Sequence, residues 1–277
     1  MVTAAWPIHT EMKTRLRALE SAALASSIYI VARKFPRKET GFYRELKPLM
    51  RKQLEEKLDQ LWAEGISGAD FFVSAIGSSI QVFSRFDKVM DEEGNGIRAN
   101  QLLDDVRTVV TEYTMKRILK GGIIGRLTPL SRFYILWRWA FGESRLQFDE
   151  AKKLAQGVGI DVALEWNKGL IRKEKEAIWL EGPSERNMED IKHSQEMIDI
   201  LHRLIILWST SRNDEMLTLL KESGLEKDET IYGVAQAIAE SLPIESKEKK
   251  LLEGFLQTRT RVIREIRTPT QQTKLIE

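Results

Sequence analysis

The chain has 277 residues, of which 42% are apolar and 30% are charged. Its 43 Lys and Arg side chains against 41 Asp and Glu give a net charge of +2, so a nucleic-acid-binding role must rest on local clusters. The absence of cysteine excludes disulfides, thiolate zinc sites and cysteine nucleophiles. The three histidines, His9, His193 and His202, lack the spacing of a metal site, and we expect no metal ion.

Hydropathy gives no sign of a membrane protein. The chain contains no run of 18 or more apolar residues, and its N-terminus lacks the basic and then apolar pattern of a signal peptide. We therefore expect a cytoplasmic protein that does not cross a membrane.

Two strands are expected near the N-terminus, at residues 2–8 and 23–34. In the second, Ile28, Ile30 and Val31 gather around Tyr29 in a nearly continuous apolar run, which is typical of a strand buried on both faces. Two strands alone do not form a stable sheet in water. This pair therefore needs a larger sheet or a helical cover.

The remaining pattern is mainly helical, so the expected fold class is mainly α with an N-terminal β-hairpin. Apolar residues recur at helical spacing over residues 42–62, where Pro48 predicts a kink or a break. A turn is expected at 91–96 and a flexible tail at 268–277. Further helices are expected at 67–83, 100–120, 128–142, 184–208, 215–222, 229–242 and 246–267.

Residues 128–181 have the layout of a winged helix-turn-helix, with three helices followed by a hairpin of GLIRK and AIWLE. Arg172, Lys173 and Lys175 would lie on the wing, where they could contact phosphates. The candidate recognition helix, residues 160–167, carries two acidic side chains and no arginine. A structural or protein-binding role therefore fits this segment at least as well as sequence-specific DNA binding does. The domains expected are 1–38 (hairpin), 39–127 (helical), 128–183 (winged-helix-like), 184–267 (helical bundle) and 268–277 (tail).

A second basic cluster lies between residues 33 and 57, where nine Lys or Arg face four Glu, a net charge of +5. The cluster could bind a nucleic-acid backbone. A solvated helix face with ion pairs four residues apart is an equal alternative. The candidate nucleic-acid contacts here are Arg33, Lys34, Arg37, Lys38, Arg51 and Lys52.

No catalytic constellation is evident. The glycine pairs at 94–96, 121–122 and 157–159 do not follow strands, as a nucleotide-binding loop requires. No Ser/His/Asp arrangement stands out, and the scattered carboxylates are expected at the surface.

Several stretches resemble the C-terminal portion of a family of archaeal and bacterial adenine-specific DNA methylases that begin with a domain of unknown function. They are TAAWPIHTEMKTR, ALASSIYIVARK, GADFFVSAIGSSIQVFSRF, SRFYILWRWAFG, ILHRLIILW and KLLEGFLQ. The resemblance implies that the two strands are the terminal hairpin of a methyltransferase sheet.

The resemblance also shows what this chain lacks. The family's Asp-Pro-Pro-Tyr type loop has no match, since the sequence contains no Pro-Pro, and the glycine-rich loop for S-adenosylmethionine is absent. We assign no catalytic, cofactor or metal residue here, although S-adenosylmethionine is implied for full-length relatives. The leading hypothesis is a methyltransferase fragment or subunit that engages DNA or a separate catalytic chain. The alternatives are a helical protein-binding adaptor and a winged-helix regulator.

Overall fold

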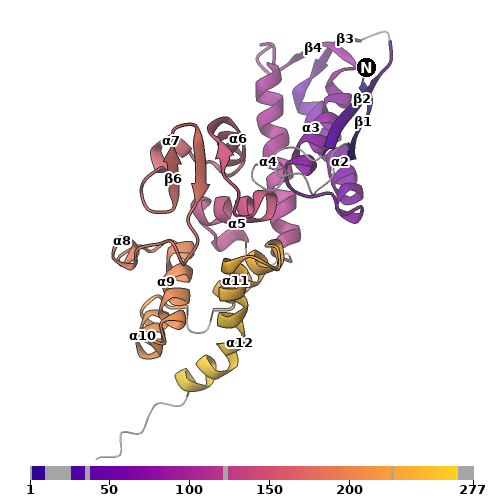
Figure 1. The fold of residues 1–277 in the computed structure, drawn as a ribbon. Coiled ribbons are helices and arrows are strands. Elements are labelled where there is room, and N and C mark those ends of the chain that lie inside the picture. Colours follow the sequence, from indigo (N-terminus) through magenta and orange to yellow (C-terminus); the bar gives the residue numbers. More distant parts are fainter. Residues whose placement is uncertain (1, 10–25, 35–37, 121–123, 226–227, 268–277) are drawn as a thin grey trace, which may run out of the picture.

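The structure is a computed structural model that describes residues 2–9, 26–34, 38–120, 124–225 and 228–267. In these ranges the chain is mainly helical, as predicted, with three small sheets. The elements form an elongated molecule, with the N-terminal strands at one end and the last helices at the other (Figure 1).

The two predicted N-terminal strands are confirmed. β1 (Val2–His9) and β2 (Ser26–Ala32) pair antiparallel, with Trp6 opposite Tyr29, and β1 lies along helix α3 (Gly68–Phe83). Val31 is 50% exposed, so the prediction of a strand buried on both faces is wrong at this end.

Helices α2 (Tyr43–Ala63), α3 and α4 (Ala99–Ile118) pack around the first hydrophobic core. The sequence predicted a kink or a break at Pro48, and the break is wrong, because α2 is continuous through this residue. Pro48 is exposed and removes only one donor, the one that would bond the carbonyl of Arg44 in the first turn. The interior side chains of this core include Met50, Leu54, Leu58, Leu61, Phe71 and Val110.

A parallel strand pair was not predicted. β3 (Lys38–Phe42) pairs with β4 (Phe86–Met90), and α2 and α3 form the crossover between them. A Cβ on Gly41 would lie 2.8 Å from the ring of Phe86, so only glycine allows this close approach. The predicted boundary between residues 38 and 39 falls inside β3. The predicted turn follows β4, where the Asp91 carboxylate accepts from the backbone N–H of Asn95 at 2.7 Å.

The middle of the molecule has the predicted element order with one added strand. The 3-10 turn η1 (Ile124–Arg126) leads into α5, where Thr128 caps the helix by accepting from the Ser131 N–H. The predicted hairpin is present as the last two strands, and the sheet order is β5-β7-β6. The elements are α5 (Pro129–Phe141), β5 (Leu146–Gln147), α6 (Phe148–Val158), α7 (Val162–Glu165), β6 (Ile171–Glu174) and β7 (Ala177–Leu180).

The helix predicted to begin at Ser184 and run through Trp208 is instead two helices. The first is the short helix α8 (Met188–Ile191), and the second is α9 (Met197–Ser209), which begins after a turn. Ser194 in that turn donates to the Asp199 carboxylate at 2.6 Å and accepts from the Glu196 N–H at 3.2 Å. These hydrogen bonds stabilise a turn at a position where the apolar periodicity predicts a continuous helix. Three further helices match the prediction: α10 (Asn213–Glu222), α11 (Thr230–Ser241) and α12 (Lys247–Arg267).

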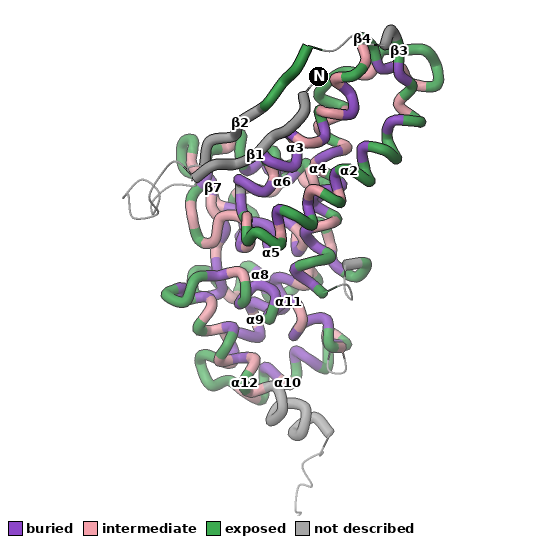
Figure 2. The backbone as a smooth tube through the Cα atoms, turned by 90° about the vertical axis from the view of Figure 1, so that its right-hand side faces the viewer, coloured by how far each residue is buried: buried purple, intermediate pink, exposed green. Residues whose placement is uncertain are grey.

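The second core extends from α4 to α12, so the predicted segments 128–183 and 184–267 share one hydrophobic interior. Figure 2 shows buried residues along the facing sides of these helices. Trp62 and Trp139 join the two cores by stacking with ring centroids 5.8 Å apart. The two hydrophobic cores are therefore in contact through these two rings.

Candidate nucleic-acid interface

The basic segment 33–57 is distributed over three elements. Arg33 and Lys34 are exposed just after β2, and Lys38 is the first residue of β3. Lys52 lies on the exposed side of α2. Arg37 falls outside the described residues. The described cations of this segment therefore do not lie on a single element.

Within this segment, Arg51 forms ion pairs with two carboxylates. Its guanidinium donates to Glu55 at 3.1 Å and to Glu112 of α4 at 2.8 Å. The hydrogen bond to Glu55 is the main reason that the pKa of Arg51 is raised. Lys47 is likewise 3.1 Å from Asp105. Acidic side chains of α4 therefore offset part of the segment's positive charge.

A hollow at the start of α2 has the same mixed charge. It is lined by Tyr43, Arg44 and Lys47 on one side and by the acidic residues 91–93 on the other. Arg44 is 3.5 Å from Glu92. Carboxylates at this position oppose a phosphate, so the hollow does not strengthen the DNA interpretation.

The three predicted wing residues lie together but in different environments. The Arg172 guanidinium donates to Glu181 at 2.7 Å, and this hydrogen bond chiefly raises the pKa of Arg172. The Lys173 ammonium lies 4.5 Å from the centre of the Trp166 ring. Lys175 is exposed in the turn between β6 and β7, with a φ of +54°. Among the described residues, Lys173 and Lys175 form no ion pair, whereas Arg172 is paired with Glu181.

The candidate recognition helix, α7, is a single turn of four residues. Its N-cap Asp161 accepts from the Ala163 N–H at 2.9 Å, and Glu165 pairs with Lys168 at 3.4 Å. Leu164 is 65% exposed at its centre. A short, acidic and apolar helix is poorly suited to the major groove, because it offers no donor for base edges.

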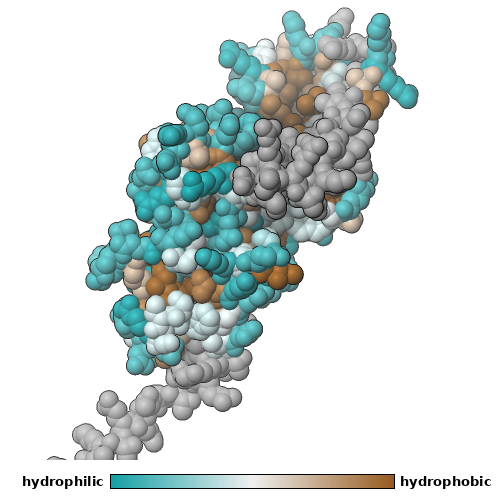
Figure 3. All heavy atoms as spheres, viewed as in Figure 1, coloured by the Kyte–Doolittle hydropathy of each residue, from teal (hydrophilic) through white to brown (hydrophobic). Residues whose placement is uncertain are grey.

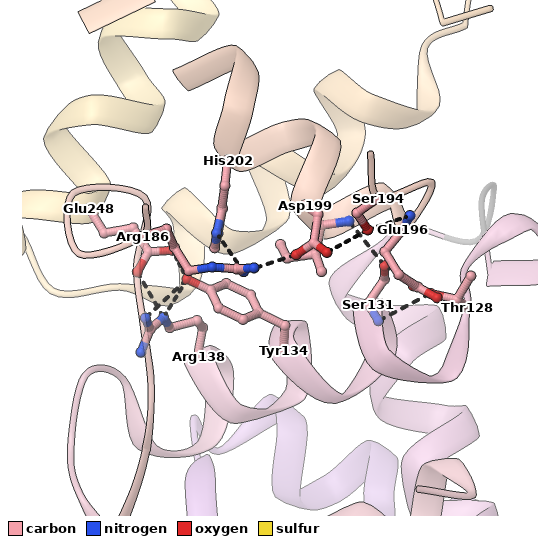
Figure 4. A network of polar contacts seen from close by, with 11 residues as sticks. Thr128, Ser131, Tyr134, Arg138, Arg186, Ser194, Glu196, Asp199, His202 and Glu248 are labelled. Carbon is pink, nitrogen blue, oxygen red and sulfur yellow. Dashed lines mark hydrogen bonds and ion pairs between the residues drawn. The ribbon is translucent and has the colours of Figure 1, made fainter. Parts of the chain in front are cut away.

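The structure also contains a buried ionic network that the sequence analysis did not predict (Figure 4). Arg138 of α5 lies 2.8 Å from Glu248 of α12, with side chains only 2% and 3% exposed. Tyr134 donates to the same carboxylate at 2.6 Å. Arg138 also donates to the carbonyls of Gly142 and Leu180 at 3.0 and 3.1 Å. The expectation that carboxylates lie at the surface is therefore wrong for Glu248.

A second buried pair extends the network toward α9. Arg186 lies 2.9 Å from Asp199, and its guanidinium is 3.5 Å from Nδ1 of His202. Burial lowers the pKa of His202 well below its usual value, and Arg186 lowers it further. Burial raises the pKa of Glu248, although Arg138 opposes this shift. Because these side chains are enclosed, the network holds α5, α9 and α12 together and offers no surface to a substrate.

One sequence signal could have located the network. Arg138 is the only charged residue between Phe133 and Phe141, a stretch otherwise composed of large apolar side chains. A cation inside such a helix needs a buried anion. The sequence does not identify that anion, because Glu248 lies on α12, far along the chain from Arg138 on α5.

Comparisons with known proteins identify no relative. No family model, no curated protein and no solved structure matches the chain. In the described ranges, no helix is long and apolar enough to cross a membrane. Nor do those ranges contain a group of three or more His, Asp or Glu side chains arranged to hold a metal ion.

Proposed function

We propose that this chain is the C-terminal part, or a separate subunit, of an S-adenosylmethionine-dependent DNA adenine methyltransferase in the cytoplasm. In this role it supports the engagement of DNA or of a catalytic chain and carries no catalytic motif of its own. The resemblance of its sequence to the C-terminal portion of such methylases is the first support. The second support is that the N-terminal hairpin has only two strands in the described residues.

The observation that carries the proposal is a two-stranded sheet lying on a largely apolar helix. The described residues provide no third strand for β1 and β2. On α3, the helix that contacts β1 and β2, Val73 and Ile80 remain 36% and 39% exposed. Figure 3 shows hydrophobic surface at this end of the molecule. Further strands from a methyltransferase sheet would pair with the hairpin and cover this surface.

Hydrogen exchange of the isolated chain tests this interpretation. We expect the amides of β1 and β2 to exchange faster than those of α5, because a hairpin without neighbouring strands opens locally at low cost. The β6–β7 hairpin is an internal control, since its side chains Ile171 and Ile178 are fully buried. Protection of Ile28, Ile30 and Val31 equal to that of the Trp137 helix would contradict the proposal.

The proposal also predicts that the isolated chain does not bind S-adenosylmethionine. Neither the glycine-rich cofactor loop nor the target-base loop has a match in the sequence. Calorimetric titration with the cofactor should therefore give only heats of dilution. A fitted dissociation constant in the micromolar range would show that this chain holds a cofactor site, and would exclude a purely supporting role.

A protein-binding adaptor is the second candidate, and the middle module favours it. α7 is acidic and only one turn long, and Glu181 neutralises Arg172. A winged-helix-like scaffold with these features is consistent with protein contact. DNA binding by the intact chain separates the two candidates, because the adaptor has no need of it.

A further inference from the structure

Three side chains lie in register across one face of the small sheet. They are Arg172 of β6, Trp179 of β7 and Arg145, the residue before β5. Trp179 of β7, the central strand, is half-buried and lies opposite Arg172 of β6. Arg145 immediately precedes β5, and its guanidinium lies 4.2 Å from the centre of the Trp179 ring. The pairing of Leu146 with Ile178 places Arg145 beside Trp179 on the opposite side from Arg172. An arginine thus occupies the paired position on either side of Trp179, and the guanidinium of Arg145 lies over its ring.

The two arginines differ in their partners. Arg172 donates to Glu181, which follows the last residue of β7 and is largely covered. Arg145 is exposed and makes no ion pair with any of the described residues. A guanidinium stacked on an indole ring keeps its N–H donors at the rim and loses little rotamer entropy when it binds. Arg145 is therefore a pre-oriented hydrogen-bond donor that has no anionic partner among the described residues.

We propose that Arg145, held by Trp179, binds a phosphate of the nucleic-acid backbone, with Lys175 at the tip of the hairpin as a second contact. A planar guanidinium matches the two oxygens of a phosphodiester, and such contacts position a protein without reading the sequence. This inference rests on the DNA engagement proposed above. It places that engagement on the sheet and the β6–β7 turn, and it leaves α7 outside the contact.

The local acidic residues limit how strong the site can be. Glu174 and Glu176 flank Lys175, and Glu181 occupies Arg172. The site therefore has few net charges, and binding should be weak and steeply dependent on salt. The same arrangement offers a variant that gains function. Glu181→Gln would release Arg172 to face the same phosphate.

The test is fluorescence anisotropy of a labelled duplex of mixed sequence, titrated with the intact chain at 50 to 200 mM salt. Arg145→Gln keeps most of the aliphatic stem on the indole and removes the charge. We expect it to weaken binding about tenfold at the lowest salt and to flatten the salt slope by about one unit. Glu181→Gln should tighten binding by about threefold and steepen the slope, since it frees a cation. Arg212→Gln, which removes an exposed arginine of the α9–α10 turn, is the matched control and should leave binding unchanged.

The outcomes separate this inference from the proposed function. If the unaltered chain fails to bind the duplex at 50 mM salt, DNA engagement fails and the inference fails with it. If the chain binds but Arg145→Gln and Glu181→Gln behave like the control, only the site at Arg145 is refuted. A thermal melt of each variant checks folding, and Arg145→Lys, which retains the charge, should recover part of the binding lost in Arg145→Gln.

Discussion

Replacing Glu248 with alanine should destabilise the protein by about 3–5 kcal/mol, the cost of leaving a buried cation without its anion. Arg138 would keep its hydrogen bonds to Tyr134 and to two carbonyls but lose the carboxylate 2.8 Å away. Burial prevents water from replacing it, since both side chains are almost fully enclosed. Urea denaturation followed by circular dichroism measures the change in the free energy of unfolding.

Two further variants give this prediction its controls. Arg138→Leu combined with Glu248→Leu removes both charges, and it should cost less than Glu248→Ala alone because no unpaired charge stays buried. Glu215→Ala breaks the exposed pair with Arg212 and should leave the midpoint nearly unchanged, because solvent already screens that pair. A small loss in Glu248→Ala, similar to that in Glu215→Ala, would show that the network does not join α5 to α12.

The sequence predicts the helices well where local signals define their ends. Thr128 and Pro129 mark the start of α5 through a capping hydroxyl and a proline at the first helical position, and Gly142 ends it. The parallel pair of β3 and β4 escapes prediction, since neither five-residue strand alternates clearly and β3 contains Gly41. Their pairing depends on a crossover of two helices, which local patterns do not reveal.

The candidate site is less predictable because it depends on contacts between distant residues. The hairpin was expected from the sequence pattern, and Lys173 and Lys175 lie on it. The sequence does not show that Glu181 occupies Arg172 or that Arg145 stacks on Trp179, since both depend on strand register. In the same way, the sequence offers Glu55 as an ion-pair partner four residues from Arg51, but it does not show the contact with Glu112, 61 residues away.

The basic segment is the rival location to the site at Arg145. If the segment carries the backbone contacts instead, removing four of its cations should have the largest effect on DNA binding. The variant replaces Arg37, Lys38, Arg51 and Lys52 with glutamine. Each lost phosphate contact flattens the slope of log affinity against log salt by about one unit. Binding should weaken alike on every sequence, because phosphate contacts carry no base information. The ion pairs of Arg51 predict that its share is smaller than that of Lys52, which is exposed on α2.

A wing variant provides the comparison, with Arg172, Lys173 and Lys175 replaced by glutamine. Arg172 is paired with Glu181, so this variant also releases a carboxylate next to the sheet. If only the wing variant loses affinity, DNA binding stands and its site moves from the basic segment to the middle module. Equal losses in both would indicate that the duplex spans the two surfaces.

The salt dependence of duplex binding by the unaltered chain tests the central claim most directly. We predict measurable, sequence-tolerant binding at 50 mM salt that falls steeply by 200 mM, as counterion release requires. The same chain, given S-adenosylmethionine, should transfer no methyl group to that duplex. No binding at the lowest salt would contradict DNA engagement and favour the protein-binding adaptor.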